Sequence, residues 1–151
     1  LKIIYMVILE TPYAVVTYRE PQKVLLLTWL QKPVLSDLKS LYMQTLAFVK
    51  EHPFIVKYCS DLTLMGSFSR EQENWLMHEF YPEVHHIIND NIFVAVVFSE
   101  SHFNAIVMNY QATTMLPIHQ IINFNYFTAQ DEAVDWLVSV KKGQDTALLT
   151  D

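Results

Sequence analysis

Glycine and cysteine are both scarce in this chain, and each shortage removes a class of chemistry. Among 151 residues there are two glycines, Gly66 and Gly143, and one cysteine, Cys59. Loops that wrap a dinucleotide or a nucleotide phosphate need several closely spaced glycines. One cysteine can build neither a disulfide framework nor a cysteine zinc site. The sequence therefore excludes these sites, and Cys59, which lies in an apolar strand pattern, is expected to be a buried, inert thiol.

Charge is scarce as well, and positive charge most of all. Charged residues make up 17% of the chain, and ten Lys and Arg against sixteen Asp and Glu give a net charge of −6. Nucleic-acid binding depends on clustered basic side chains that neutralise phosphates. The densest basic run here is Lys141-Lys142. We therefore expect no nucleic-acid partner.

Long hydrophobic runs are missing too. The longest are Ile3–Leu9 and Ile92–Phe98, well short of the roughly 18–20 residues that span a bilayer. The first run is followed by Glu10-Thr11-Pro12 without a small-residue cleavage site, so it is interpreted as a strand and not as a signal peptide. The sequence predicts no membrane span and a cytoplasmic protein.

Hydrophobic residues are plentiful in total, at 52%, and they include nine Phe, eight Tyr and three Trp. A chain of this length buries roughly 68–70% of its unfolded surface when it folds. We expect one domain over residues 1–143 and a frayed tail at 144–151. The aromatic residues at core spacing are Tyr5, Tyr42, Phe48, Trp75, Phe80, Phe103, Tyr110, Phe124 and Trp136.

Alternation and apolar runs predict strands at residues 3–9, 13–19, 23–30, 54–60, 92–98 and 122–127. Helices are predicted to begin at caps formed by Ser36, Ser69, Ser99 or Ser101, and Thr128. Pro53 is expected to stop the first helix, Pro82 to end or break the second, and Lys141-Lys142-Gly143 to mark the end of the last. This order predicts an α/β fold with a mixed sheet: an N-terminal antiparallel hairpin, then alternating helices and strands. Residues 92–98 should form a parallel, fully buried strand.

Several local features accompany this order and resemble a family of small bacterial STAS-like proteins, which are similar to the sporulation anti-sigma-factor antagonist. The residues that carry the resemblance are Trp29, Asp61, Ser69, Trp75-Leu76, Pro82, Phe98, Ser99, Ser101, Phe103, Phe127, Ala133, Trp136 and Leu137. The resemblance covers roughly residues 3–140 and implies a single STAS-like domain. The function of the small family is mostly unassigned, so the resemblance motivates a regulatory role without defining it. The wider family's phosphorylated Asp-Ser-Ser-Gly-type segment has no counterpart here, which puts phospho-regulation of this chain in doubt.

The carboxyl ends of parallel strands are where such sheets prefer to bind ligands. One candidate is an interaction loop with Asp61, Gly66, Ser67, Phe68 and Ser69. The other is a strand-end cluster with Ser99, Glu100, Ser101 and His102. The serines have an alternative role as helix caps.

Two catalytic patterns are weighed and set aside. Glu100, Ser101 and His102 include the ingredients of a hydrolase, but neighbouring helical residues do not face each other, and a Gly-x-Ser-x-Gly elbow is missing. His78, Glu79, His85 and His86 suggest a metal site, but their spacing departs from His-Glu-x-x-His and Pro82 interrupts them. No catalytic residue, metal or cofactor is predicted.

The function predicted from these features is a non-enzymatic regulatory or protein-interaction module. It would present the loop from Asp61 to Ser69 to a protein partner, and it could form a homodimer. The alternative is a protein that binds a small apolar ligand or lipid, which the aromatic content and the mean hydropathy of +0.17 favour. A hydrolase that uses Ser101 and His102 is a third hypothesis.

Overall fold

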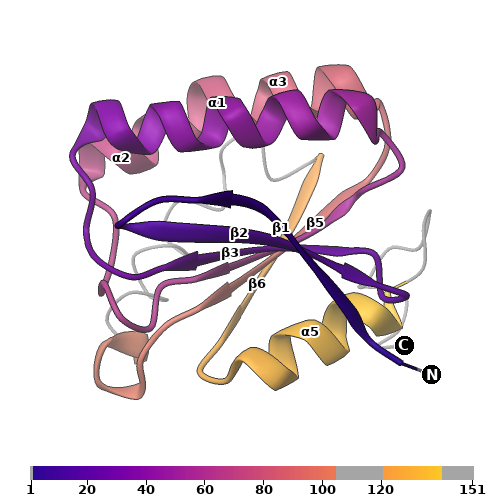
Figure 1. Cartoon of the computed structure of the whole chain (residues 1–151). Coiled ribbons are helices and arrows are strands. Elements are labelled where there is room, and N and C mark those ends of the chain that lie inside the picture. Colours follow the sequence, from indigo (N-terminus) through magenta and orange to yellow (C-terminus); the bar gives the residue numbers. More distant parts are fainter. Residues whose placement is uncertain (1, 105–120, 141–151) are drawn as a thin grey trace.

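The computed structural model describes residues 2–104 and 121–140, and its centre is one six-stranded mixed sheet. Its strands are β1 (Ile4–Glu10), β2 (Ala14–Glu20), β3 (Val24–Trp29), β4 (Lys57–Asp61), β5 (Ile92–Val97) and β6 (Ile122–Phe127). The spatial order of the strands is their order in the sequence. The pairs β1–β2 and β2–β3 are antiparallel, and the remaining pairs are parallel (Figure 1). The predicted α/β fold class is confirmed.

Helices lie on both faces of this sheet (Figure 1). The first face carries α1 (Leu35–Glu51), α2 (Arg70–Trp75), the π-helical turn η1 (Leu76–Phe80) and α3 (Tyr81–Ile88). The opposite face carries α5 (Gln130–Ser139), which packs on β3 to β6 and most closely on β5. The sheet is therefore the middle of three layers, and a hydrophobic cluster lies on each side of it.

The continuous apolar sequences of β3 and β5 follow from this layering. In β5 all six residues are buried, as the sequence predicts. Val94 and Val96 belong to the cluster under α1 to α3, and Phe93 and Ala95 belong to the cluster under α5. Successive strand residues point to opposite faces, so a strand covered on both sides must be apolar at every position.

Pro82 does not end the second helix, which corrects the sequence interpretation. The chain stays helical from α2 through η1 into α3, and Pro82 lies in the first turn of α3. Within the turn before it, the Tyr81 amide donates to the Leu76 carbonyl, five residues back. This wider π spacing accommodates a ring that would clash with the preceding turn of a regular α-helix.

Three helix ends also differ from the prediction. The N-cap of α1 is Val34 and not Ser36, because the Pro33 carbonyl accepts a bond from Gln72 and the chain stays extended as far as Val34. The N-cap of α5 is Ala129, one residue after Thr128, and its side chain makes no capping bond. This helix ends at Ser139, four residues before Gly143.

Two predicted features lie outside the described residues. They are the continuation of the helix that begins at residue 100, with Ile106, Val107 and Tyr110, and the tail at 144–151. Strand β4 starts at Lys57 and not at residue 54, because a turn occupies His52 to Ile55. Among the described helices, none has the length and apolar character needed to cross a membrane.

Strand β1 differs from every other strand in its exposure. Residues Ile3 to Val7 are all hydrophobic, and their exposed fractions lie between 42% and 57%. The strand lies at one edge of the sheet, so its inner side pairs with β2 and its outer side pairs with no described residue. Tyr5, which the spacing places in the core, is 55% exposed. The faces of a strand are buried by the layers packed on them, and α5 packs on β3 to β6 and not over β1, which explains this result.

Candidate functional site

The polar side chain at the start of the interaction loop predicted after β4 is engaged in hydrogen bonds within the protein. Asp61 is buried, and one carboxylate oxygen accepts bonds from the Thr63 amide at 2.9 Å and from its hydroxyl. The other oxygen accepts a 2.9 Å bond from the side-chain amide of Gln130, the first residue of α5. Asp61 therefore shapes the turn after β4 and attaches it to the start of α5.

The remaining loop residues also have structural roles. Gly66 has a φ of +95°, a conformation that residues with a side chain rarely adopt. Phe68 is 9% exposed and lies edge-on to Trp29, with ring centroids 5.4 Å apart. Ser69 forms the predicted capping box: its hydroxyl accepts from the Gln72 amide, and the Gln72 side chain accepts from the Ser69 amide. Ser67 is half-buried.

The exposed tip of this loop is a pair that sequence reasoning did not single out. Thr63 is exposed, and Leu64 is 68% exposed. A partner that binds the loop would therefore contact Leu64 and not the buried Phe68. The sequence does place an apolar residue, Leu64, in a loop between Thr63 and Gly66. That pattern fits an exposed loop tip and also fits a side chain that packs into the core, so it did not identify Leu64 as exposed.

The strand-end cluster after β5 forms a small hydrogen-bonded group at the surface. The Ser99 hydroxyl lies 2.9 Å from His102 Nδ1, and the Ser101 hydroxyl lies 3.3 Å from the same nitrogen. The two hydroxyls are 3.2 Å apart. Glu100, Ser101 and His102 are exposed. The closest serine to the imidazole is thus Ser99, three residues away and on the same side of the turn, and not the adjacent Ser101 of the hydrolase hypothesis.

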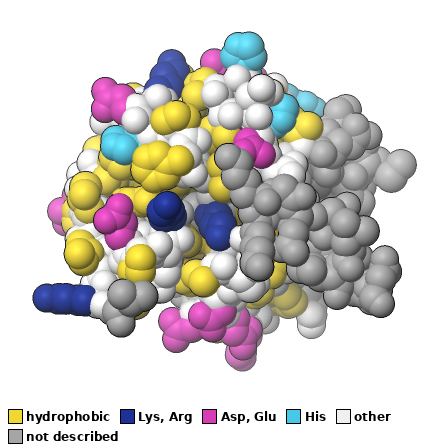
Figure 2. Space-filling view, turned by 90° about the vertical axis from the view of Figure 1, so that its right-hand side faces the viewer, with side chains coloured by type: hydrophobic (Ala, Val, Ile, Leu, Met, Phe, Trp, Pro, Cys, Tyr) yellow, Lys and Arg dark blue, Asp and Glu magenta, His cyan; other side chains and the backbone are white. Residues whose placement is uncertain are grey.

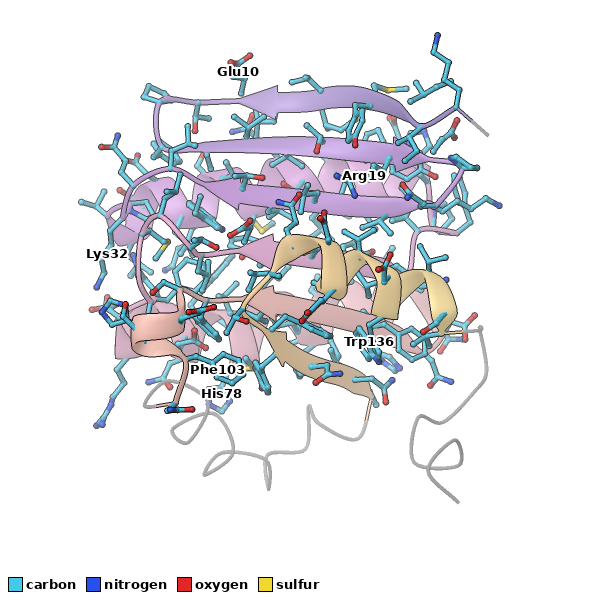
Figure 3. The ribbon with its side chains drawn as sticks, turned by 90° about the horizontal axis from the view of Figure 1, so that it is seen from below. Glu10, Arg19, Lys32, His78, Phe103 and Trp136 are labelled. Carbon is cyan, nitrogen blue, oxygen red and sulfur yellow. The ribbon has the colours of Figure 1, made fainter. Side chains whose placement is uncertain are left out.

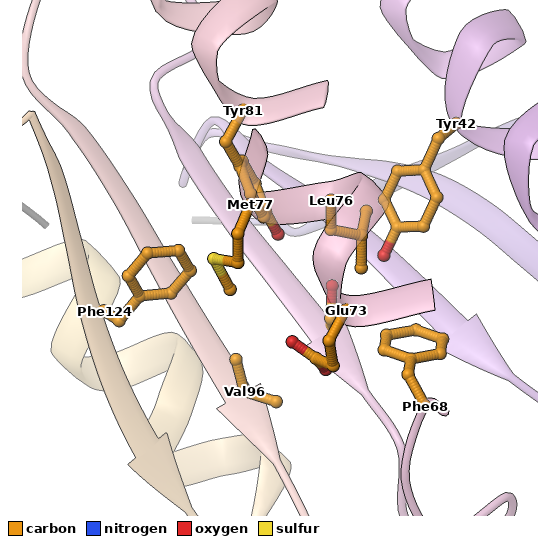
Figure 4. Close-up of a pocket in the computed structure, with 9 residues that line it drawn as sticks. Tyr42, Phe68, Glu73, Leu76, Met77, Tyr81, Val96 and Phe124 are labelled. Atoms are coloured by element: carbon orange, nitrogen blue, oxygen red, sulfur yellow. The ribbon is translucent and has the colours of Figure 1, made fainter. Parts of the chain in front are cut away.

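A narrow pocket lies between the α2–η1–α3 helix and strands β4, β5 and β6 (Figure 4). In Figure 4 the carboxylate of Glu73 and the hydroxyl of Tyr42 lie toward the same space, and Phe68 and Phe124 stand on opposite sides of it. The cavity measures about 20 Å³, which is room for roughly one water molecule. A lipid chain does not fit a space of this size.

Glu73 interacts electrostatically with three tyrosines in this region. Burial raises the pKa of Tyr42, Tyr81 and Tyr126, and the nearby Glu73 carboxylate raises each of these pKa values further. The three phenols therefore stay protonated at neutral pH. Glu73 was not identified from the sequence, because its apolar surroundings come from four separate segments.

Metal-ligating residues do not converge in the part of the chain that the structure describes. No group of three His, Cys, Asp or Glu side chains there could hold an ion. His78, Glu79 and His86 are exposed along the continuous helix. Cys59 is fully buried, and burial raises the pKa of its thiol to about 12, with a further contribution from Asp61.

Among the residues that the structure describes, the most extensive exposed hydrophobic feature is the segment Ile3 to Val7 at the start of β1. In Figure 3, α5 lies over the middle of the sheet and leaves the Glu10 side, where β1 lies, without a helix over it. On that open face the guanidinium of Arg19 lies over the Tyr5 ring, 4.8 Å from its centroid. Figure 2, which views the side where the chain begins, shows hydrophobic side chains gathered at the surface around a few charged ones.

Comparison with known proteins returned no significant match to a family model, to a curated protein or to a solved structure. The resemblance to STAS-like proteins therefore stays a prediction from the sequence. The functional argument depends on the geometry of the loop, the pocket and β1.

Proposed function

We propose that this chain is a non-enzymatic protein-interaction module and that β1 is its main contact strand. One observation carries the proposal: five consecutive hydrophobic residues, Ile3 to Val7, are all 42–57% exposed on an edge strand. Such an edge presents unpaired backbone N–H and C=O groups and attracts further strands. Exposed apolar patches on soluble proteins mark interaction sites in the same way.

The chemistry of this edge fits strand addition. A partner strand would supply backbone hydrogen bonds along the outer side of β1, and alternate side chains would meet both faces. Ile4 and Met6 lie on the α1 side, because they pair with Glu20 and the buried Tyr18 of β2. Tyr5 and Val7 lie on the other side. Both faces therefore offer hydrophobic contacts to an added strand.

The loop after β4 is a secondary contact in this proposal, through Leu64 alone. A regulatory role agrees with the resemblance to STAS-like proteins. Phosphorylation is not part of the proposal, because the hydroxyl of Ser69 is engaged in the capping box and Ser67 is half-buried.

Site-specific photo-crosslinking tests the proposal. A benzophenone amino acid replaces Val7 in one protein and Met43 in a control, since Met43 is a similarly exposed hydrophobic residue on α1 (57% and 49%). Each protein is irradiated alone and in extract from its source cells, and adducts are identified by mass spectrometry. We expect one discrete adduct from position 7 and none from position 43. Equal labelling at both positions, or no adduct at position 7, would disprove the role of β1.

A further inference from the structure

We propose that the strand added to β1 is the β1 of a second copy of this chain, paired antiparallel about a two-fold axis. This inference rests on the proposed function and names its partner. The two six-stranded sheets would join into one continuous sheet with β1 and its counterpart at the centre. The exposed outer edge of β1 would then be covered in both copies.

The charges that flank β1 favour this partner. Lys2 precedes the hydrophobic run and Glu10 ends it, with no charged residue between them. In an antiparallel pair of identical strands, Lys2 of each copy approaches Glu10 of the other. A parallel pair would place like charges together. The strand is therefore complementary to itself in one orientation and not in the other.

One register satisfies these charges and keeps the hydrophobic residues opposed. With Met6 opposite Met6 of the second copy, Tyr5 faces Val7 and Ile4 faces Ile8. Lys2 and Glu10 then lie at the same end of the pairing, and the register shift between Val7 and Leu9 turns Glu10, which pairs with Val15, toward the open side of the sheet. Met6 would extend the α1 side of the sheet, and Tyr5 with Val7 would extend the open side. Each hydrophobic face thus continues across the axis.

The bulge in β1 agrees with a pairing centred on this segment. The register with β2 shifts between Val7 and Leu9, so Ile8 is an extra residue and the strand bends there. Residues Ile4 to Val7 form the straight, regularly paired portion. The central pairs of the proposed register, Met6 with Met6 and Tyr5 with Val7, lie in that portion. Ile8 and Glu10 lie at and beyond the bulge.

The opposite edge of the described sheet is less suited to self-pairing. In β6 the aromatic residues alternate with Asn123 and Asn125, and Asn residues are disfavoured in strands. The Asn123 side-chain amide already donates to the Ile92 carbonyl at 3.2 Å. All residues of β6 are at least half-buried in this structure. The unbroken hydrophobic run and the wide exposure belong to β1.

Sedimentation equilibrium of the full chain tests this proposal with a matched pair of variants. Met6→Lys puts a charge into the centre of the pairing, and Met43→Lys makes the same change on α1, where exposure is nearly equal (52% and 49%). We expect a dimer for the native chain and for Met43→Lys. Met6→Lys should raise the dimer dissociation constant at least about 100-fold, since a buried unpaired charge is costly. A native chain that stays monomeric up to millimolar concentration would overturn the proposal, as would a Met6→Lys variant that dimerises normally.

Charge exchange gives an independent test of the antiparallel register. Lys2→Glu and Glu10→Lys should each raise the dissociation constant by roughly three- to tenfold at low salt, because each variant opposes like charges at both ends. The double variant restores opposite charges and should recover the native affinity. If the double variant is as weak as the singles or weaker, Lys2 does not meet Glu10 and the proposed register is wrong. Thermal melts of all variants confirm that they fold.

The two proposals fail in different ways. A monomeric chain whose position 7 still crosslinks to one other protein would remove the second copy and keep the interaction module. A chain that neither dimerises nor crosslinks at position 7 would remove both. A dimer that survives Met6→Lys would move the interface away from β1.

Discussion

Gln72 connects two parts of the chain that are far apart in sequence. It is 3% exposed; its side-chain oxygen accepts from the Ser69 amide at 2.9 Å, and its nitrogen donates to the Pro33 carbonyl at 2.8 Å. The first bond follows from the capping-box pattern. The second could not be predicted, because no local pattern links residues 33 and 72.

Replacing Gln72 with Glu tests this second bond. At pH 7 the carboxylate of Gln72→Glu would face the Pro33 carbonyl without a proton to donate, and we expect a loss of about 1–3 kcal/mol in the free energy of unfolding. At pH 4 part of the Glu population is protonated and can donate again, so the loss should shrink. Urea unfolding at both pH values, with Ser69→Ala as the control, measures this. An equal loss at both pH values would contradict the bond to Pro33.

Cys59 and the buried tyrosines predict how stability depends on pH. Burial raises the pKa of the Cys59 thiol from 9.0 to about 12 in the folded state. The unfolded chain therefore releases this proton first, and stability, complete below pH 9, should fall as pH rises from 9 toward 12, by up to about 1.4 kcal/mol per pH unit. Tyr42, Tyr58 and Tyr81, whose pKa values burial also raises, add to this loss above pH 10.

Urea unfolding at pH 8, 9 and 10 checks this dependence. Cys59→Ala serves as the control, because it removes the thiol and should flatten the decline between pH 9 and 10. A thiol reagent at pH 8 should label the native chain slowly and the unfolded chain at once. Rapid labelling of the native chain would show that Cys59 is accessible.

Leu137 and Val138 are neighbours on α5 with opposite environments. Leu137 is fully buried against the sheet, and Val138 is 47% exposed. Leu137→Ala should lower the free energy of unfolding by about 2–5 kcal/mol, while Val138→Ala should change it by less than about 1 kcal/mol. Chemical denaturation of both variants makes this comparison. Equal losses would mean that α5 is rotated from the position described.

Trp136 occupies an intermediate place on the same helix. Its ring packs on Phe93 and Phe127, with centroids 6.2 and 5.9 Å away, yet it is only partly buried. The helical spacing placed it in the core with Leu137. Helical spacing shows which residues face the sheet and does not show how completely the neighbouring residues cover each of them. Trp136 packs against the cluster under α5 and stays partly exposed.

At the scale of elements, the helix from Arg70 to Ile88 shows why proline rules are incomplete. A proline inside an apolar helical pattern predicts a break, since the ring clashes with the turn before it. Here the π spacing of η1 widens that turn, and the helix continues with Tyr81 and Val84 buried. Packing against Tyr42 and Phe124, whose rings lie 4.7 Å from Phe80 and 5.4 Å from Tyr81, holds both halves on one face.

Hydrogen exchange should separate the strands by position. Amides of β5, which is buried and lies between two parallel neighbours, should exchange slowest. Outward amides of β1 should exchange fast at micromolar concentration and become protected as the concentration rises, if a second copy adds to them. Exchange measured by mass spectrometry at two concentrations checks this, with β5 as the internal reference. If the exchange rates of the β1 amides are the same at both protein concentrations, β1 does not pair with a second copy.

For the whole molecule, the fold class was predictable and the exposure of β1, the proposed contact strand, was not. The unbroken apolar runs of β3 and β5 indicated strands buried on both faces, and the alternation with helices indicated parallel pairing. The run Ile3–Leu9 is just as apolar, and the sequence predicted only that it forms a strand. Its exposure depends on the strand order and on which strands α5 covers. Neither is written in any single segment.

The predicted loop and strand-end residues illustrate the same limit. Asp61 and Ser69 were identified correctly as residues of the strand end and the helix start, but their side chains are occupied by Gln130, Thr63 and Gln72. Polar residues at such positions serve both ligand binding and local structure. Only the partners that each side chain finds in three dimensions distinguish the two roles.

The strand order also bears on how the chain is made. Because each strand lies beside the one before it in sequence, the sheet can grow strand by strand as the polypeptide leaves the ribosome, and no later strand must insert between two earlier ones. The hairpin pairs β1–β2 and β2–β3 are local and favour rapid formation, whereas the parallel pairs join strands far apart in the sequence and form more slowly. Among the described strands β1 is synthesised first, so its outer side is uncovered while the rest of the sheet is still being made. If the proposed self-pairing is correct, two growing copies can pair through β1 before translation is complete.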